Sequence, residues 1–367
     1  MQTLQHYHDA YQRLPAQVQS AQRRQALDRL LRLGLPTRAE EDWKYTDLSA
    51  VEGLEPYTTA DAAPTLALTL PAREDGDGID ALNAAFASGG LDLSVRAGQT
   101  SPRVIDAAGA GHRRHRIRVE RGAHALIRFE ADADAPFQTA VLELDLAPGA
   151  HAQVLRLQQA GPDAHRITRI HARVARDAVL DISTLDLGGK LGRHDVRVDL
   201  AEPGAQASVR GLFCIDGQGH VDNYTRIEHH AVHGTSREFY RGLASARGRG
   251  VFRGAVIVHP GAQKTDSEQR VASLLLSPGA EIDAKPELEI YADDVKCAHA
   301  NSFGQLDPAA LLYLRTRGLS QEQARALLTL AFALEPLRQV PDEGFRADCI
   351  QRVAAYFGAS LDGDALA

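Results

Sequence analysis

Residues 195–209 read Asp-Val-Arg-Val-Asp-Leu-Ala-Glu-Pro-Gly-Ala-Gln-Ala-Ser-Val, and this stretch contains the pattern that decides the fold. Val196, Val198 and Leu200 alternate with charged residues, which is typical of a β-strand with one buried face. Gly204-Ala205 then marks a turn before the next strand. The same alternation recurs from about residue 116 to about residue 290. No strong helical pattern interrupts it, so a doubly wound α/β fold is disfavoured.

The turns in this region recur at nearly constant spacing. Successive turns are separated by 27 to 30 residues, and the last interval is 18 residues. They fall at Gly122-Ala123, Gly149-Ala150, Asp177-Ala178, Gly204-Ala205, Gly234-Thr235, Gly261-Ala262 and Gly279-Ala280. Such a period indicates a solenoid, and short repeated strands favour a right-handed parallel β-helix. A β-sandwich, whose turns also recur, is the alternative.

Helical patterns occupy the two ends of the chain. Near the N-terminus, apolar residues at helical spacing precede Gly34 and Pro36, and a second short helix is expected over 79–87. Near the C-terminus, Asp307-Pro308 and the Ser320/Gln323 capping box each predict the start of a helix, and a last amphipathic helix follows. Because the open end of a solenoid needs a cap, we expect the C-terminal helices to supply one and to offer a face to a partner.

These patterns divide the chain into four parts. We predict an N-terminal helical region over 1–78, an α/β transition segment over 79–115, a β-helix core over 116–305 and a C-terminal helical domain over 306–367.

Composition narrows the class of protein. The 367 residues are 44% hydrophobic and 24% charged, and the formal net charge of −7 argues against a nucleic-acid-binding protein. The N-terminal residues lack the layout of a signal peptide, and the three cysteines are far apart. Both features predict a reducing, cytoplasmic location.

The usual catalytic and nucleotide-binding motifs are missing from the sequence. Gly188-Gly189-Lys190 is followed by Leu191, so it is not a P-loop, and no HExxH or GxSxG motif occurs. We therefore predict that the chain is not an enzyme.

Histidines cluster at His229-His230-Ala231-Val232-His233, with His220 upstream. On a strand, His229 and His233 share one face and could chelate a metal ion. A polar outer face of a coil is the simpler interpretation.

Cys297 and His299 form the second candidate site. At positions i and i+2 of a strand they point the same way, and a thiolate with an imidazole suits zinc, copper or an iron–sulfur cluster. A metal centre needs about four ligands. The remaining ligands must therefore come from elsewhere in the chain or from a second protein. Cys214, between Phe213 and Ile215, is expected to be a buried small hydrophobe.

Several segments resemble the SufB/SufD family. They are Gly34–Arg38, Glu41–Thr46, Lys264–Gln269, Asp293–Asp307, Tyr313–Gly318 and Ala324–Leu328, and they span about residues 34–335. The length of the chain and its few cysteines resemble the shorter members. Within Asp293–Asp307, Ala298 and Ala300-Asn301 depart from the usual Cys-Ser-His-Gly pattern of the family.

The resemblance implies a scaffold subunit for iron–sulfur cluster assembly. It implies pairing with a SufB subunit through the β-helices, docking of a SufC ATPase on the C-terminal helices, and no stably bound cofactor of the isolated chain. His299 then matches a ligand of a nascent iron–sulfur cluster at the SufB interface, and Cys297 matches the neighbouring cysteine. Arg315, Arg317 and Arg325 fall in the region that resembles the SufC-docking surface.

Two further interpretations stay open. The chain could be a stand-alone β-helix that binds or acts on carbohydrate, although its strands are poor in aromatic residues. It could also pair with itself when SufB is missing, because exposed strand edges favour self-association.

Overall fold

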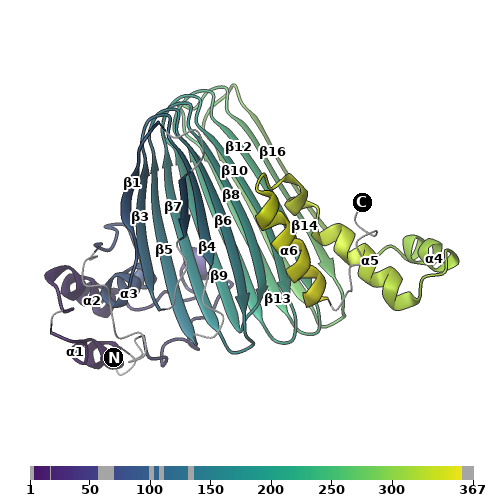
Figure 1. Ribbon diagram of the computed structural model, residues 1–367, viewed down its shortest axis with the longest axis horizontal. Helices are drawn as coiled ribbons and strands as arrows, with labels where there is room; N and C mark the ends of the chain where they lie inside the picture. Colours follow the sequence, from purple (N-terminus) through teal and green to yellow (C-terminus); the bar gives the residue numbers. More distant parts are fainter. Residues whose placement is uncertain are drawn as a thin grey trace.

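Two parallel β-sheets, stacked face to face, form the body of the molecule (Figure 1). The computed structural model describes residues 4–16, 18–56, 70–98, 103–106, 111–130 and 136–357. Each sheet has eight strands, and successive strands of the chain alternate between the two sheets. Neighbouring strands of a sheet pair in parallel, for example β9 with β11 and β8 with β10. The parallel β-helix prediction is therefore confirmed, and the antiparallel sandwich is excluded.

The odd-numbered strands form sheet A. They are β1 (Asp92–Val95), β3 (Arg113–Val119), β5 (Phe137–Leu146), β7 (His165–Val174), β9 (Leu191–Leu200), β11 (His220–His229), β13 (Arg249–Val258) and β15 (Glu281–Ile290). The even-numbered strands form sheet B. They are β2 (Arg103–Asp106), β4 (His124–Glu130), β6 (His151–Ala160), β8 (Val179–Gly188), β10 (Gln206–Ile215), β12 (Thr235–Ala244), β14 (Asp266–Leu275) and β16 (Lys296–Gly304).

Helices flank the solenoid at both ends of the chain. They are α1 (Gln5–Gln12), α2 (Ala21–Leu33), α3 (Gly78–Phe86), α4 (Pro308–Thr316), α5 (Gln321–Ala333) and α6 (Glu343–Tyr356), with 3-10 turns η1 (Glu41–Trp43) and η3 (Pro336–Gln339). No helix in the described part of the chain is long and apolar enough to cross a membrane.

The core between the sheets follows from the alternation in the sequence. Val196, Val198 and Leu200 point inward from β9, and Ile182 and Val209 meet them from sheet B. All five are at most 1% exposed. In-register stacking repeats each inward position in the next coil, so the apolar core is continuous along the solenoid.

The turn repeat marks one corner of the solenoid. The residue with left-handed backbone conformation at this corner is, in successive coils, Gly122, Gly149, Asp177, Gly204, His233 and Lys264. Each precedes a strand of sheet B. Gly279-Ala280 instead precedes β15 of sheet A, so it lies at a different corner. That change of corner explains why the last interval in the sequence is short.

The sheets begin before residue 116. β1 pairs with β3, and β2 pairs with β4, so residues 92–106 already add strands to both sheets. These early strands are only four residues long, which is too short for the alternation to be recognised. The division into domains stays a prediction, and residues 57–69 and 358–367 lie outside the described part of the chain.

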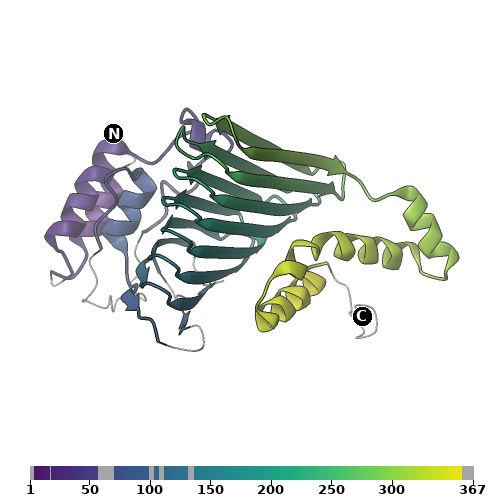
Figure 2. The ribbon, with the colours of Figure 1, turned by 90° about the horizontal axis from the view of Figure 1, so that it is seen from above.

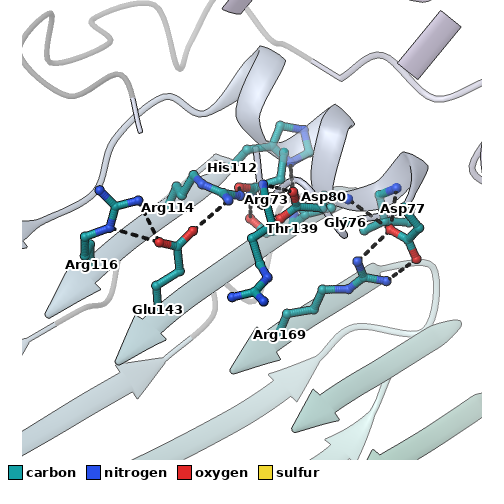
Figure 3. Close-up of polar contacts among 12 residues, drawn as sticks. Arg73, Gly76, Asp77, Asp80, His112, Arg114, Arg116, Thr139, Glu143 and Arg169 are labelled. Carbon is teal, nitrogen blue, oxygen red and sulfur yellow. Dashed lines mark hydrogen bonds and ion pairs between the residues drawn. The ribbon is translucent and has the colours of Figure 1, made fainter. Parts of the chain in front are cut away.

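The N-terminal helices pack on the outer face of sheet A, in a cluster that includes Phe137, Ile167 and Leu191. Buried ion pairs fasten α3 to the sheet (Figure 3). Asp77 caps α3 and accepts two hydrogen bonds of 2.6 Å from Arg169. One turn later, Asp80 lies 2.9 Å from the buried Arg114 guanidinium.

α5 and α6 cover the outer face of sheet B, whereas we expected the C-terminal helices to cap the end of the solenoid. α5, η3 and α6 pack on an apolar surface of leucine side chains that spans several coils (Figures 1 and 2). These leucines are Leu126, Leu155, Leu157, Leu185, Leu187, Leu212, Leu243 and Leu274. Burying this apolar face decides where the helices lie. The solenoid end formed by β15 and β16 is left open.

Candidate functional site at the open end of the solenoid

The open end has the properties of an interface. β15 and β16 are the last strands of their sheets, so each has one edge without a neighbouring strand in the described part of the chain. Almost all of β16 is exposed. Ile290 and Phe303, which continue inward-facing positions of earlier coils, are 42% and 52% exposed. A further coil from another chain would bury both side chains.

Cys297 and His299 lie side by side on β16, on the face that continues the inside of the solenoid. Their register partners on β14 are Ser267 and Gln269, which are 3% and 0% exposed. Ala298 and Ala300 point the other way, in register with Glu268 and Arg270. The sequence prediction that Cys297 and His299 share a face is therefore confirmed.

The inward positions become polar toward this end. The position of His299 is occupied in the preceding coils by Ile127, Val154, Ile182, Val209, Glu238 and then Gln269. The position of Cys297 is occupied by Ala125, Ala152, Leu180, Ala207, Ser236 and then Ser267. Among the strands from β4 to β14, only β12 and β14 place polar residues in these two rows. The thiol and the imidazole therefore lie next to a layer of polar side chains inside the solenoid. We call this layer the polar floor; it consists of Ser236, Glu238, Ser267 and Gln269.

Hydrogen bonds organise that floor in two chains. Under His299, the Gln269 amide donates from Nε2 to Glu238 at 2.5 Å. The Gln269 Oε1 atom is buried and has no hydrogen-bond partner among the described residues. Gln269 is the ladder neighbour of His299, and neighbouring strands of a sheet are about 4.8 Å apart.

Under Cys297, His229 and Ser236 approach to 2.9 Å, and the Ser236 hydroxyl donates to Ser267 at 2.8 Å. Burial raises the pKa of the Cys297 thiol, although a backbone N–H of Ser267 partly opposes the shift. The thiol is therefore protonated at neutral pH in the isolated chain. A bound metal ion would have to displace this proton.

The site is incomplete as a metal centre. Among the described residues, Cys297 and His299 belong to no group of three or more His, Cys, Asp or Glu side chains with ligand atoms within 4.8 Å of one another. One sulfur and one nitrogen can hold a metal ion only if another molecule adds ligands.

The arginines predicted for partner docking lie on a different part of the molecule. α4 has no buried residue and lies away from both sheets (Figure 2). It exposes Leu312 and Tyr313 by 61% and 57%. Arg315 is exposed at its last turn, and Arg317 stacks on the Tyr313 ring at 5.2 Å. Arg325, on α5, donates to the Leu276 carbonyl and ties α5 to the solenoid.

Sequence analysis missed Glu238 and Gln269. The available signal was a polar residue at a position where the strands of earlier coils carry an apolar one. Burial raises the pKa of Glu238 to about 7. Cys214 is fully buried under the C-terminal helices, as predicted, and burial raises its pKa.

The histidine cluster is arranged differently from the prediction. His229 points inward and contacts Ser236, whereas His233 has φ of 61° at the corner after β11 has ended. The two side chains do not share a strand face, because the chain turns between them. His230 points outward instead and stacks on His259.

Comparisons with known proteins agree with this architecture. Residues 103–332 match the family model described as "SUF system FeS cluster assembly, SufBD core domain". The chain therefore belongs to the SufBD family of the SUF iron–sulfur cluster assembly system, as the sequence resemblance implied.

Within this family the chain is SufD-like. It is 30% identical over 401 aligned positions to the iron–sulfur cluster assembly protein SufD of Escherichia coli (strain K12), and the alignment covers 94% of both chains. It is 32% identical over 205 positions to a SufBD family protein of Synechocystis sp., covering 56% of this chain and 45% of that protein. A chloroplastic protein of Arabidopsis thaliana is 31% identical over 207 positions, covering 56% of this chain and 44% of that protein.

Proposed function

We propose that this chain is a cytoplasmic, non-ATPase scaffold subunit that supports iron–sulfur cluster assembly at an interface with a SufB-like subunit. The observation that carries the proposal is the pairing of an open solenoid end with an incomplete ligand set. Cys297 and His299 lie where the next coil of a partner β-helix would stack. Membership of the SufBD family supplies the chemical context.

In this proposal His299 contributes a neutral imidazole nitrogen to the nascent cluster, which is cargo and not a resident cofactor. Cys297 is the neighbouring thiolate once metal binding has displaced its proton. The partner supplies the remaining ligands, so the isolated chain holds no cluster stably. The unpartnered Gln269 Oε1 can accept a hydrogen bond from the imidazole and thereby fix its tautomer.

The second partner is a SufC-like ATPase, which we place on the C-terminal helices. Leu312 and Tyr313 give α4 an exposed apolar face, and Arg315 and Arg317 flank it. Exposed apolar and arginine side chains on one helix are typical of protein interfaces. Arg325 is exposed as well, and its guanidinium donates to the Leu276 carbonyl.

Two alternative roles are weighed against this proposal. Without a SufB-like subunit, the same edge strands can pair with a second copy of this chain. A stand-alone carbohydrate-binding solenoid is disfavoured, because the matched relatives are named for iron–sulfur cluster assembly.

The ligand role is tested by His299→Ala in the chain co-expressed with its SufB-like and SufC-like partners. We expect the complex to assemble normally and the cluster absorbance after reconstitution to fall by about tenfold or more. Asn301→Ala is the matched control, because Asn301 lies on the same strand and the same face. Normal cluster build-up in a fully assembled His299→Ala complex would exclude the ligand role and leave a purely structural subunit.

A further inference from the structure

A second group of metal-ligating side chains lies on the outer surface of sheet A. Glu228 is near the end of β11, and His230 and His259 directly follow β11 and β13. The His230 N–H donates to the Leu200 carbonyl and the His259 N–H to the His229 carbonyl, both at 3.0 Å. The two histidines therefore occupy the same position in consecutive coils, and backbone hydrogen bonds fix their spacing.

The side chains converge on one point. The two imidazole rings stack with centroids 4.3 Å apart and planes 15° apart. The Glu228 Oε2 atom lies 2.8 Å from His259 Nε2 and 3.8 Å from His230 Nε2. All three ligand atoms are within 4.8 Å of one another.

These separations suit a transition-metal ion. Ligand bonds of about 2.0–2.2 Å in a tetrahedral site place neighbouring donor atoms about 3.3–3.6 Å apart. The observed distances from Glu228 to the two histidines bracket that value.

Two carboxylates lie next to the two histidines. Arg226 donates to the Oε1 atom of Glu228 at 2.7 Å, which leaves Oε2 directed at the imidazoles. Asp199 Oδ1 lies 3.6 Å from His230 Nε2 and adds a second carboxylate beside the group.

We propose that Glu228, His230 and His259 form a surface site for a divalent first-row transition-metal ion. Two imidazoles and one carboxylate are the donor set that proteins use for Zn²⁺ and Fe²⁺. The histidines are 36% and 37% exposed at their side chains, so a bound ion keeps access to water. This surface site is separate from the site of Cys297 and His299. The proposal does not depend on the role of those two residues.

The test is a titration of the purified full-length chain with Zn²⁺, followed by calorimetry and by metal analysis after dialysis. All variants are made in a His299→Ala background, so that Cys297 and His299 cannot act together as a chelating pair. We expect one Zn²⁺ per chain, with affinity reduced at least tenfold by Glu228→Gln and by His259→Gln.

His151→Gln is the matched control. His151 is 35% exposed at its side chain, lies 3.2 Å from Asp181 and has the His124 ring 5.6 Å away, but these side chains form no three-ligand group. This variant keeps the Zn²⁺ site.

The proposal is overturned if the parent chain binds no Zn²⁺, or if both site variants bind it as tightly as the parent. Circular dichroism checks that each variant is folded. If Glu228→Gln or His259→Gln is not folded, His230→Gln gives an independent third measurement.

Discussion

Replacement of the buried Glu238 by glutamine should make the stability of this protein less dependent on pH. Glu238 points into the solenoid from β12 and is 2% exposed. Its hydrogen-bond partner is the neutral amide of Gln269. Burial raises its pKa from the ordinary 4.5 to about 7. Glutamine has nearly the same size and shape and carries no charge.

The magnitude and its sign follow from the shift in pKa. The folded chain holds the proton of Glu238 more tightly than the unfolded chain does. The free energy of unfolding therefore falls as the pH rises from about 4.5 to about 7, and the full penalty is present above that range. A shift of this size corresponds to about 3 kcal/mol, because one pKa unit is about 1.4 kcal/mol. For 367 residues, about 3 kcal/mol is equivalent to about 4 °C in melting temperature.

The assay is thermal unfolding followed by circular dichroism between pH 4.5 and pH 8.5. We expect Glu238→Gln to melt above the parent chain at pH 8 and at nearly the same temperature at pH 4.5. Glu281→Gln is the control, because Glu281 is an exposed carboxylate on β15 and its replacement should leave the pH profile unchanged. A difference between Glu238→Gln and the parent that is constant over this range would refute the reasoning, because Glu238 would then titrate as an ordinary carboxyl group.

Two further predictions concern the floor of the site and the docking of α3. Gln269→Leu removes the buried amide oxygen in the position next to His299, so cluster build-up in the assembled complex should fall about tenfold. Unchanged build-up in Gln269→Leu would exclude a positioning role. Arg114→Met leaves Asp80 and Glu143 without their buried partner, so the free energy of unfolding should fall by about 3–5 kcal/mol in denaturant titrations; a loss below 1 kcal/mol would show that this ion-pair network does not hold α3.

The solenoid could be predicted because its signals are local. Alternation within Asp195–Leu200 specifies one strand with one buried face, and the recurring turns specify that the strands stack. The position of Cys297 and His299 on one face follows from the same two-residue period.

The packing of the C-terminal helices could not be predicted, because it depends on a second buried face. In β8, Leu180 and Ile182 point inward, whereas Leu185 and Leu187 point outward under the helices. The apolar residues change face in the middle of the strand, at Ser183-Thr184, so no single alternating pattern marks the second buried face. The polar floor of the site was missed for a related reason. Whether Glu238 stacks below His299 depends on the register of three successive coils, which the sequence alone does not fix.

The measurement that tests the central claim most directly is co-purification of this chain with its SufB-like and SufC-like partners, compared between Phe303→Asp and Leu312→Asp. Phe303 lies at the open solenoid end and Leu312 on α4, and both are exposed in the isolated chain. Phe303→Asp should lose the SufB-like subunit and keep the SufC-like ATPase, and Leu312→Asp should do the reverse. Retention of the SufB-like subunit by Phe303→Asp at the wild-type level would contradict the assignment of the open end as the assembly interface.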